Sequence, residues 1–207
     1  RFDKTVAKIK HDKAILSRDY DVLAAATSET PKITLPSPTR IHFYGGRSMI
    51  SAAAYPDIKE FWVDVAKFYQ AEISALEERG CRYIQIDDPV MTYFLDDQMR
   101  DYLQAVGEDP NALIDKYARL LNACVSERRA DTHLSMHLCR GYAMSSWMVA
   151  VGYSRLAEAI FPVVDVDTFF LEYDDERSGD FAPLELVEES KNVVLGLVTS
   201  KWGELET

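Results

Sequence analysis

Cysteine is scarce in this sequence, and positive charge is outweighed by negative charge. The 207 residues include three cysteines, Cys81, Cys124 and Cys139, an odd number at spacings that suggest no disulfide framework. Such sparse cysteine is typical of a reducing compartment, so we expect a cytoplasmic protein. The chain has 34 acidic and 23 basic residues, which gives a formal net charge of −11. This negative charge argues against nucleic acid or an anionic membrane as a partner.

Long apolar runs and glycine-rich nucleotide-binding motifs are also missing. No stretch approaches the ~20 apolar residues that span a bilayer, and no signal peptide is visible. Neither G-x-G-x-x-G nor a Walker loop occurs, which leaves a nucleotide-binding doubly wound sheet without support. The chain begins with Arg1 rather than methionine, and we expect it to be part of a longer protein.

Apolar strands and amphipathic helices alternate along the chain. Residues 1–30 form a predicted helical segment, and residues 31–207 form a predicted domain. The strands predicted in that domain are 32–43, 81–87, 132–138, 164–171 and 193–198. Helices separate them, the clearest being those opened by Asp57 and by Asp109-Pro110. Strict alternation, with a last strand that is apolar on both faces, indicates a parallel sheet covered by helices. We therefore predict an α/β fold, a (β/α)8 TIM barrel with about five of its eight strands present.

A histidine and a cysteine end the third predicted strand, as His137-Leu-Cys139. Residues two apart in a strand point the same way, so both side chains leave on one face. Glu172 ends the next apolar run and brings a carboxylate to the same edge of the sheet. These donors suit Zn²⁺, and three protein ligands are typical of a catalytic site with an open position. The alternative is a buried cysteine beside a histidine whose hydrogen bonds are satisfied.

Other polar groups also follow predicted strands. Asp87 and Asp88 end the second strand, and Thr199-Ser-Lys201 follows the fifth. In barrels and open α/β sheets, sites are built at the carboxyl ends of the strands. The alternatives are a solvated turn for the two aspartates and a surface position for the lysine.

Three strand ends together resemble one known family. They are Ile-Gln-Ile-Asp-Asp-Pro at 84–89, His-Leu-Cys at 137–139, and Phe-Leu-Glu at 170–172 with Asp-Glu-Arg-Ser-Gly-Asp at 175–180. Over about residues 32–201, their order and spacing resemble the C-terminal catalytic barrel of the cobalamin-independent methionine synthases. The similarity is greatest to the methionine-synthase-like members that consist of a single barrel.

The resemblance implies a zinc ion held by His137, Cys139 and Glu172. The family's fourth ligand, a cysteine on the last strand, would lie beyond Thr207. The family's early serine- and glycine-rich substrate segment, together with the first two barrel strands, would precede residue 1.

The resemblance also implies roles for four further residues. Asp87 corresponds to an aspartate that helps to bind the amino acid substrate, and Asp88 follows it where the family usually has glutamate. Tyr44, with Phe43 as the alternative, lies where an aromatic residue stacks on the folate pterin. The full-length enzymes carry an aspartate and a histidine, thought to protonate the departing folate nitrogen, in a segment where this chain has Thr199-Ser-Lys201. This difference leaves the identity of the methyl donor open. We consider Lys201 as a catalytic proton donor.

The implied activity is methyl transfer from a folate of the 5-methyltetrahydrofolate type to the thiol of homocysteine, giving methionine. The expected cofactor is Zn²⁺, and the expected partners are a homocysteine-like thiol and a methylfolate-like donor. Three alternatives stay open: zinc-dependent alkyl transfer to another thiol, zinc-activated hydrolysis, and an inactive, truncated barrel. Because unpaired strand edges favour association, the truncated barrel would be stable only as a homo-oligomer.

Overall fold

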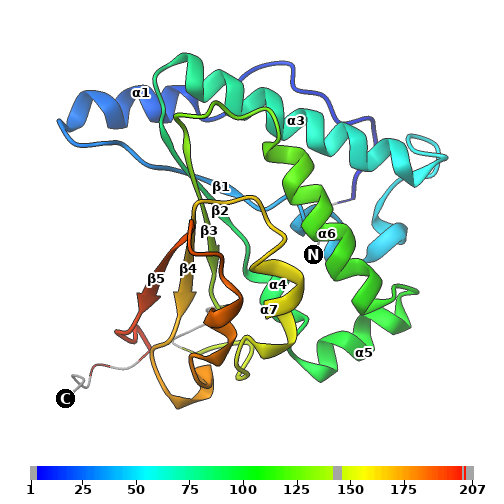
Figure 1. Ribbon diagram of the computed structural model, residues 1–207. Helices are drawn as coiled ribbons and strands as arrows, with labels where there is room; N and C mark the ends of the chain where they lie inside the picture. Colours follow the sequence, from blue (N-terminus) through cyan, green and yellow to red (C-terminus); the bar gives the residue numbers. More distant parts are fainter. Residues whose placement is uncertain (1–3, 142–145, 202, 204–207) are drawn as a thin grey trace.

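A five-stranded parallel sheet forms the centre of the protein in the computed structural model, which describes residues 4–141, 146–201 and 203 (Figure 1). The strands follow the chain in the order β1 (Ile33–Pro36), β2 (Tyr83–Asp87), β3 (His133–Leu138), β4 (Thr168–Glu172) and β5 (Asn192–Gly196). Every neighbouring pair is parallel. The predicted parallel sheet is confirmed, and it is the sheet of an incomplete barrel.

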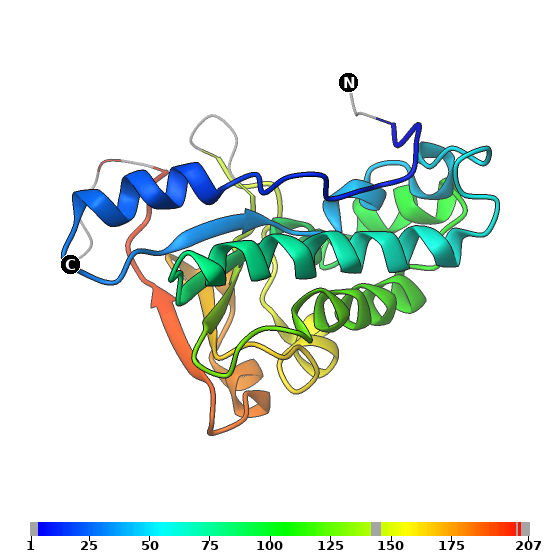
Figure 2. The same cartoon turned by 90° about the horizontal axis from the view of Figure 1, so that it is seen from above.

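The helices pack on one side of this sheet, where α3 and α6 lie side by side (Figures 1 and 2). They are α1 (Ser17–Ala26), α2 (Arg40–Phe43), α3 (Ile58–Glu78), α4 (Pro89–Tyr93), α5 (Asp97–Ala105), α6 (Pro110–Val125) and α7 (Ser154–Ile160). Three short 3₁₀ turns accompany them: η1 (Gly46–Met49), η2 (Glu176–Ser178) and η3 (Ala182–Leu186). Among the described residues, no helix has the length and apolar character needed to cross a membrane.

Both helix starts predicted from capping residues are confirmed. The Asp57 carboxylate accepts the Lys59 N–H at 2.9 Å, and Asp109 accepts the Asn111 N–H at 2.9 Å with Pro110 at the first helical position. These caps satisfy backbone donors that have no partner within a helix. They fix the start of the two longest helices.

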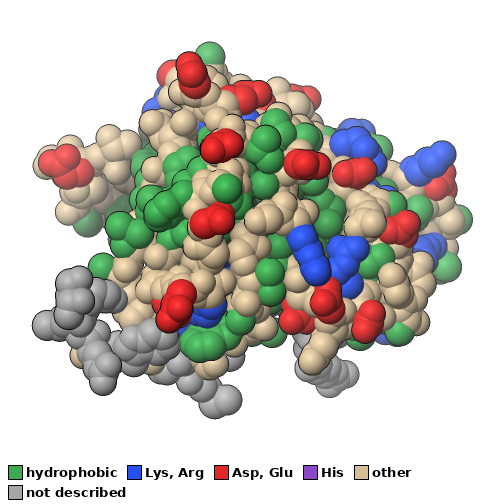
Figure 3. Space-filling view, turned by 60° about the horizontal axis from the view of Figure 1, so that its bottom comes forward, with side chains coloured by type: hydrophobic (Ala, Val, Ile, Leu, Met, Phe, Trp, Pro, Cys, Tyr) green, Lys and Arg blue, Asp and Glu red, His purple; other side chains and the backbone are tan. Residues whose placement is uncertain are grey.

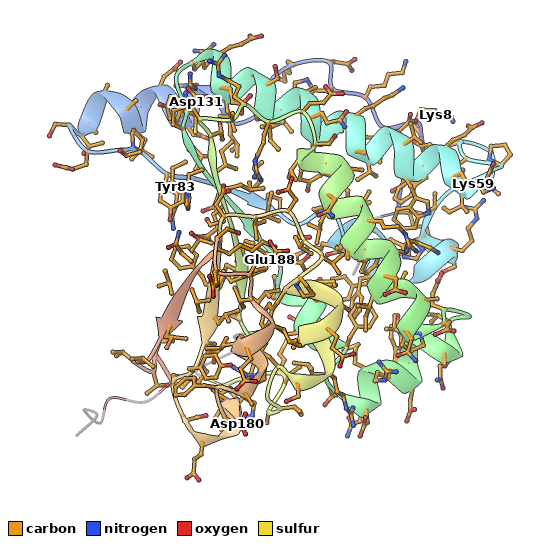
Figure 4. All side chains as sticks on the ribbon, viewed as in Figure 1. Lys8, Lys59, Tyr83, Asp131, Asp180 and Glu188 are labelled. Atoms are coloured by element: carbon orange, nitrogen blue, oxygen red, sulfur yellow. The ribbon has the colours of Figure 1, made fainter. Side chains whose placement is uncertain are left out.

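The two faces of the sheet have opposite character. The face toward the helices, here the outer face, is apolar and buried, and carries Ile33, Leu35, Ile84, Ile86, Leu134, Met136, Leu138, Phe169 and Leu171. The opposite face, here the inner face, is mostly polar and carries Tyr83, Gln85, Asp87, His133, Ser135, His137, Thr168, Phe170 and Glu172. Tyr83 points away from α3 and α6 in Figure 4. This division follows the period of two in a strand.

Several predicted boundaries differ from the structure. The helical segment expected over 1–30 is helical only over α1, within the residues described. The strand expected over 32–43 ends at Pro36, because Pro36 and Pro38 donate no ladder hydrogen bond. The helix α2 begins at Arg40, after Thr39 as its N-cap. The sequence analysis also missed α4 and α5.

The last predicted strand, apolar on both faces, is confirmed as a parallel strand, but it is not buried on both faces. β5 lies at the edge of the sheet, and Val194 is 43% exposed. Leu197 and Val198, which follow it, are 54% and 76% exposed. Hydrophobic side chains also gather on the face seen in Figure 3, with separate acidic side chains among them. The run of apolar residues therefore indicated the strand correctly, but it did not indicate whether other elements cover both faces of that strand.

Candidate active site

Four of the predicted site residues line one cavity at the carboxyl ends of the strands. The cavity has a volume of about 360 Å³ and is formed mainly by the inner face of β3, β4 and β5. Its lining includes His137, Cys139, Glu172 and Lys201. Asp87 pairs with His137 in the strand register and borders this site from β2. Strands far apart in sequence thus bring an imidazole, a thiol and two carboxylates to one edge.

The imidazole of His137 has two polar neighbours. Its Nδ1 contacts the carboxylate of Asp87, and the side chain of Cys139 lies near enough to influence the charge of the ring. Burial lowers the pKa of His137, but Asp87 and Cys139 together outweigh burial and raise the pKa to about 10. The metal-free imidazole is therefore protonated at neutral pH, and a metal ion binding there would have to displace that proton.

The donor chemistry of His137 and Cys139 fits a zinc-type ion. Histidines that bind metals usually hydrogen-bond through their second ring nitrogen to a carboxylate, and the carboxylate of Asp87 contacts His137 in this way. Cys139 is only partly buried, so its sulfur has access to the cavity. Among the residues that the structure describes, however, no three His, Cys, Asp or Glu side chains are grouped closely enough to hold a metal. His137 and Cys139 are paired, whereas Glu172 lines the same cavity with other partners.

The carboxylate of Glu172 is held by three donors. Its Oε1 accepts from Lys201 Nζ at 2.6 Å and from Arg177 Nη2 at 2.8 Å, and its Oε2 accepts the Arg140 N–H at 2.8 Å. Burial raises the pKa of Glu172, but these donors outweigh it and lower the pKa to about 2. Glu172 is therefore an anion at neutral pH, as a metal ligand must be.

Arg140, which the sequence analysis missed, ties the strand ends together. It is fully buried, donates from Nε to the carbonyl of Val151 at 2.8 Å, and from Nη1 to the carbonyl of Glu172. Its Nη2 donates to the carbonyl of Ser178 at 3.2 Å. A charged residue directly after His-x-Cys was the one signal in the sequence. Its full burial fixes the backbone on both sides of the cavity.

Asp88 lies away from the cavity, in a buried hydrogen-bond network. Its carboxylate accepts from Ser37 Oγ at 2.5 Å, from Thr39 Oγ1 at 3.1 Å and from the Met91 N–H at 3.1 Å. Complete burial raises its pKa to about 6, although these hydrogen bonds oppose the rise. Asp88 thereby caps α4 and anchors the loop after β1. Its predicted contact with substrate stays a prediction.

Tyr44, predicted to stack on a pterin ring, lies half-buried just after α2. Its ring packs edge-on against Phe43 with centroids 5.3 Å apart, and its hydroxyl is a hydrogen-bond partner of Tyr93. The Tyr93 hydroxyl also donates to Met148 Sδ at 3.4 Å, and Tyr93 is near Cys139. Tyr93, in the helix that the sequence analysis missed, thus links Tyr44 to the site. The stacking role of Tyr44 stays a prediction.

Comparison with curated proteins finds two relatives of similar identity in Bacillus subtilis (strain 168), both named as uncharacterized. YxjH is 41% identical over 190 residues, and YxjG is 42% identical over 191 residues. Each alignment covers 91% of this chain and 50% of the relative, so the chain spans about half the length of these proteins. The methionine synthase of Pyrococcus abyssi (strain GE5 / Orsay) is 44% identical over 93 residues, which cover 44% of this chain and 26% of that protein.

Solved structures give the same picture for the fold. A Listeria monocytogenes protein named "Putative Vitamin-B12 Independent Methionine Synthase" matches with a TM-score of 0.76 and 33% identity, over 99% of this chain and 57% of that chain. A B12-independent methionine synthase from Shewanella sp. W3-18-1, solved with selenomethionine, matches with a TM-score of 0.60 and 20% identity. That match covers 90% of this chain and 50% of the Shewanella chain, and it bears on the fold alone.

The family comparison covers most of the chain. Residues 23–201 match the model described as the catalytic domain of cobalamin-independent synthase. The matched range contains all five strands and the residues that line the cavity. This chain therefore belongs to the cobalamin-independent methionine synthase family.

Proposed function

We propose that the protein to which this chain belongs is a zinc-dependent methyltransferase. It would move a methyl group from a methylfolate-like donor to the thiol of homocysteine, giving methionine. One observation carries the proposal: in a member of this family, His137, Cys139 and Glu172 line a single cavity, and Asp87 contacts the second nitrogen of the imidazole.

The reaction forms a carbon–sulfur bond and breaks a carbon–nitrogen bond. The thiol loses a proton, and the departing nitrogen gains one. A zinc ion held by His137, Cys139 and Glu172 would keep the substrate sulfur as a thiolate, which is the nucleophilic form. The protein itself has to position the amino acid, exclude water and supply the proton.

Two side chains suit these tasks. Asp87 is 41% exposed while it contacts His137, so its carboxylate is open to the ammonium group of an amino acid substrate. The Lys201 ammonium lies in the wall of the cavity and is almost fully buried, at 5% exposure. Its pKa is lowered by burial but raised, on balance, by Glu172 and Asp174. We assign the amino group of the substrate to Asp87 and proton donation to Lys201.

The test is metal content and methyl transfer in the intact polypeptide that carries these residues. We expect about one zinc per chain by mass spectrometry, lost in Cys139→Ser and retained in Cys124→Ser, where the cysteine lies in the core of α6. Methionine formation from homocysteine and 5-methyltetrahydrofolate should follow the zinc content. Zinc retained at full occupancy by Cys139→Ser would contradict the proposed site, and a panel of other thiols would identify a different acceptor.

A further inference from the structure

Two cations share one oxygen atom of Glu172. Lys201 Nζ lies 2.6 Å from Oε1, and Arg177 Nη2 lies 2.8 Å from the same atom. The second oxygen, Oε2, accepts the Arg140 N–H at 2.8 Å. Two donors fill the two lone pairs of Oε1, whereas Oε2 accepts one hydrogen bond. A metal ion can therefore bind Oε1 only if one of the two cations leaves.

The two cations are held to different degrees. Arg177 contacts Glu172, Asp174 and Asp175, and its guanidinium lies over the ring of Trp147 at 4.4 Å. Lys201 contacts Glu172 and Asp174, and it is the one of the two that lines the cavity. A lysine ammonium is a point charge on a flexible stem, whereas an arginine fork is planar and fixed by several bonds. Lys201 is therefore the easier cation to displace.

We propose that Lys201 is a built-in counter-ion of Glu172 that competes with a metal ion for Oε1, so that Lys201 sets the metal affinity of the site. This inference rests on the zinc site of the proposed function. In the metal-free protein the ammonium neutralises a carboxylate that is only 12% exposed. When a metal ion reaches Glu172, the ammonium is repelled from Oε1 and keeps its second partner, Asp174, 2.9 Å away.

The proposal gives Lys201 opposite effects on two measurable properties. Without metal, the lysine stabilises the fold, because a buried carboxylate that loses its partner is costly. With metal, the same lysine competes with the ion and weakens its binding. A residue that merely supports the site would raise both stability and metal affinity, so the two properties together distinguish a competitor from a support.

The experiment compares Lys201→Met with Lys201→Arg in the intact protein, using zinc alone as the probe. In Lys201→Met we expect about a 10-fold gain in zinc affinity by chelator competition, the scale typical of groups next to a metal ligand. The melting temperature of the same variant in chelator should fall by roughly 5 °C. Lys201→Arg, which keeps the charge, should stay within about 3-fold of the wild type.

Lys8→Met is the matched control, since Lys8 also pairs with a glutamate, Glu60, but lies far from the strand ends (Figure 4). It should change neither property. Unchanged or weaker zinc binding in Lys201→Met, alongside a loss in Glu172→Gln, would overturn the competitor role and leave the zinc site in place. If neither the wild type nor Lys201→Met binds zinc, both this inference and the metal of the proposed function fail.

Discussion

The two faces of the sheet have different roles: the outer face contributes packing to stability, and the inner face carries the side chains of the candidate site. The outer face is buried under helices and contains no charged side chain among its described residues, whereas the inner face carries Asp87, His137 and Glu172. Neighbouring residues on one strand therefore have different functions, because successive side chains point to opposite faces. The chain can change its chemistry on one face while keeping the packing on the other.

Adjacent pairs make this contrast concrete. Phe169 is fully buried against Phe161, with ring centroids 5.1 Å apart, whereas Phe170 is partly exposed beside Lys32. Asp88 is fully buried, whereas its neighbour Asp87 is open to solvent on one side. Each pair offers a test in which residue type and position along the chain are nearly constant and only the face changes.

The largest effect is expected for Phe169→Ala. Removing this ring from the outer face leaves a cavity in a packed core, and we expect a loss of about 3–5 kcal/mol in the free energy of unfolding. Phe170→Ala removes a phenyl ring from the inner face, where the Lys32 ammonium lies 4.3 Å from the ring centroid. This change should lower the free energy of unfolding by about 1 kcal/mol or less. Urea denaturation of both variants measures the difference. Equal losses would mean that the inner face is as tightly packed as the outer one.

A smaller effect, visible as a pH dependence, is expected for Asp88→Asn. Burial raises the pKa of Asp88 from 3.8 to about 6, so the folded state binds this proton more tightly than the unfolded state. The resulting stabilisation is complete below pH 3.8 and is lost as the pH rises to about 6. A rise of this size corresponds to about 3 kcal/mol.

The measurement is the difference between wild type and Asp88→Asn in unfolding free energy at pH 4 and pH 6.5. We expect the wild type to lose stability relative to the variant over this interval. Asparagine keeps an oxygen that can accept the Met91 N–H, so the variant should still cap α4. Parallel pH profiles for the two proteins would show that Asp88 does not titrate in this range.

The smallest effect compares two cysteines in chelator. Cys124 is fully buried in α6, and burial raises the pKa of its thiol, so Cys124→Ser places a hydroxyl in an apolar site at a cost of about 1–3 kcal/mol. Cys139 is only partly buried at the cavity, and Cys139→Ser should change stability by about 0.5 kcal/mol or less. If thermal unfolding showed a larger loss of stability for Cys139→Ser than for Cys124→Ser, Cys139 would be the cysteine buried in the core.

Much of the fold could be predicted because local patterns specify it. Asp57 and Asp109 mark helix starts by satisfying free backbone donors, and the alternation of strands and helices implies a parallel sheet. The helix α4 was missed because its start depends on Asp88, which the strand-end motif suggested for another role. The irregular segment before α1 depends on a distant residue, Glu72, which accepts the N–H groups of Ile15 and Leu16.

For the site, the sequence by itself determined which donors exist and that they follow strands. The motif His137-Leu-Cys139 and the strand-end Glu172 required no structure to find, because a period of two and the parallel order place them at one edge. Only the tertiary structure decided their partners: Asp87 on the imidazole, Lys201 and Arg177 on the glutamate, and Arg140 buried behind them. Such contacts join residues up to 50 positions apart, and they depend on how side chains share a small buried volume rather than on any local pattern.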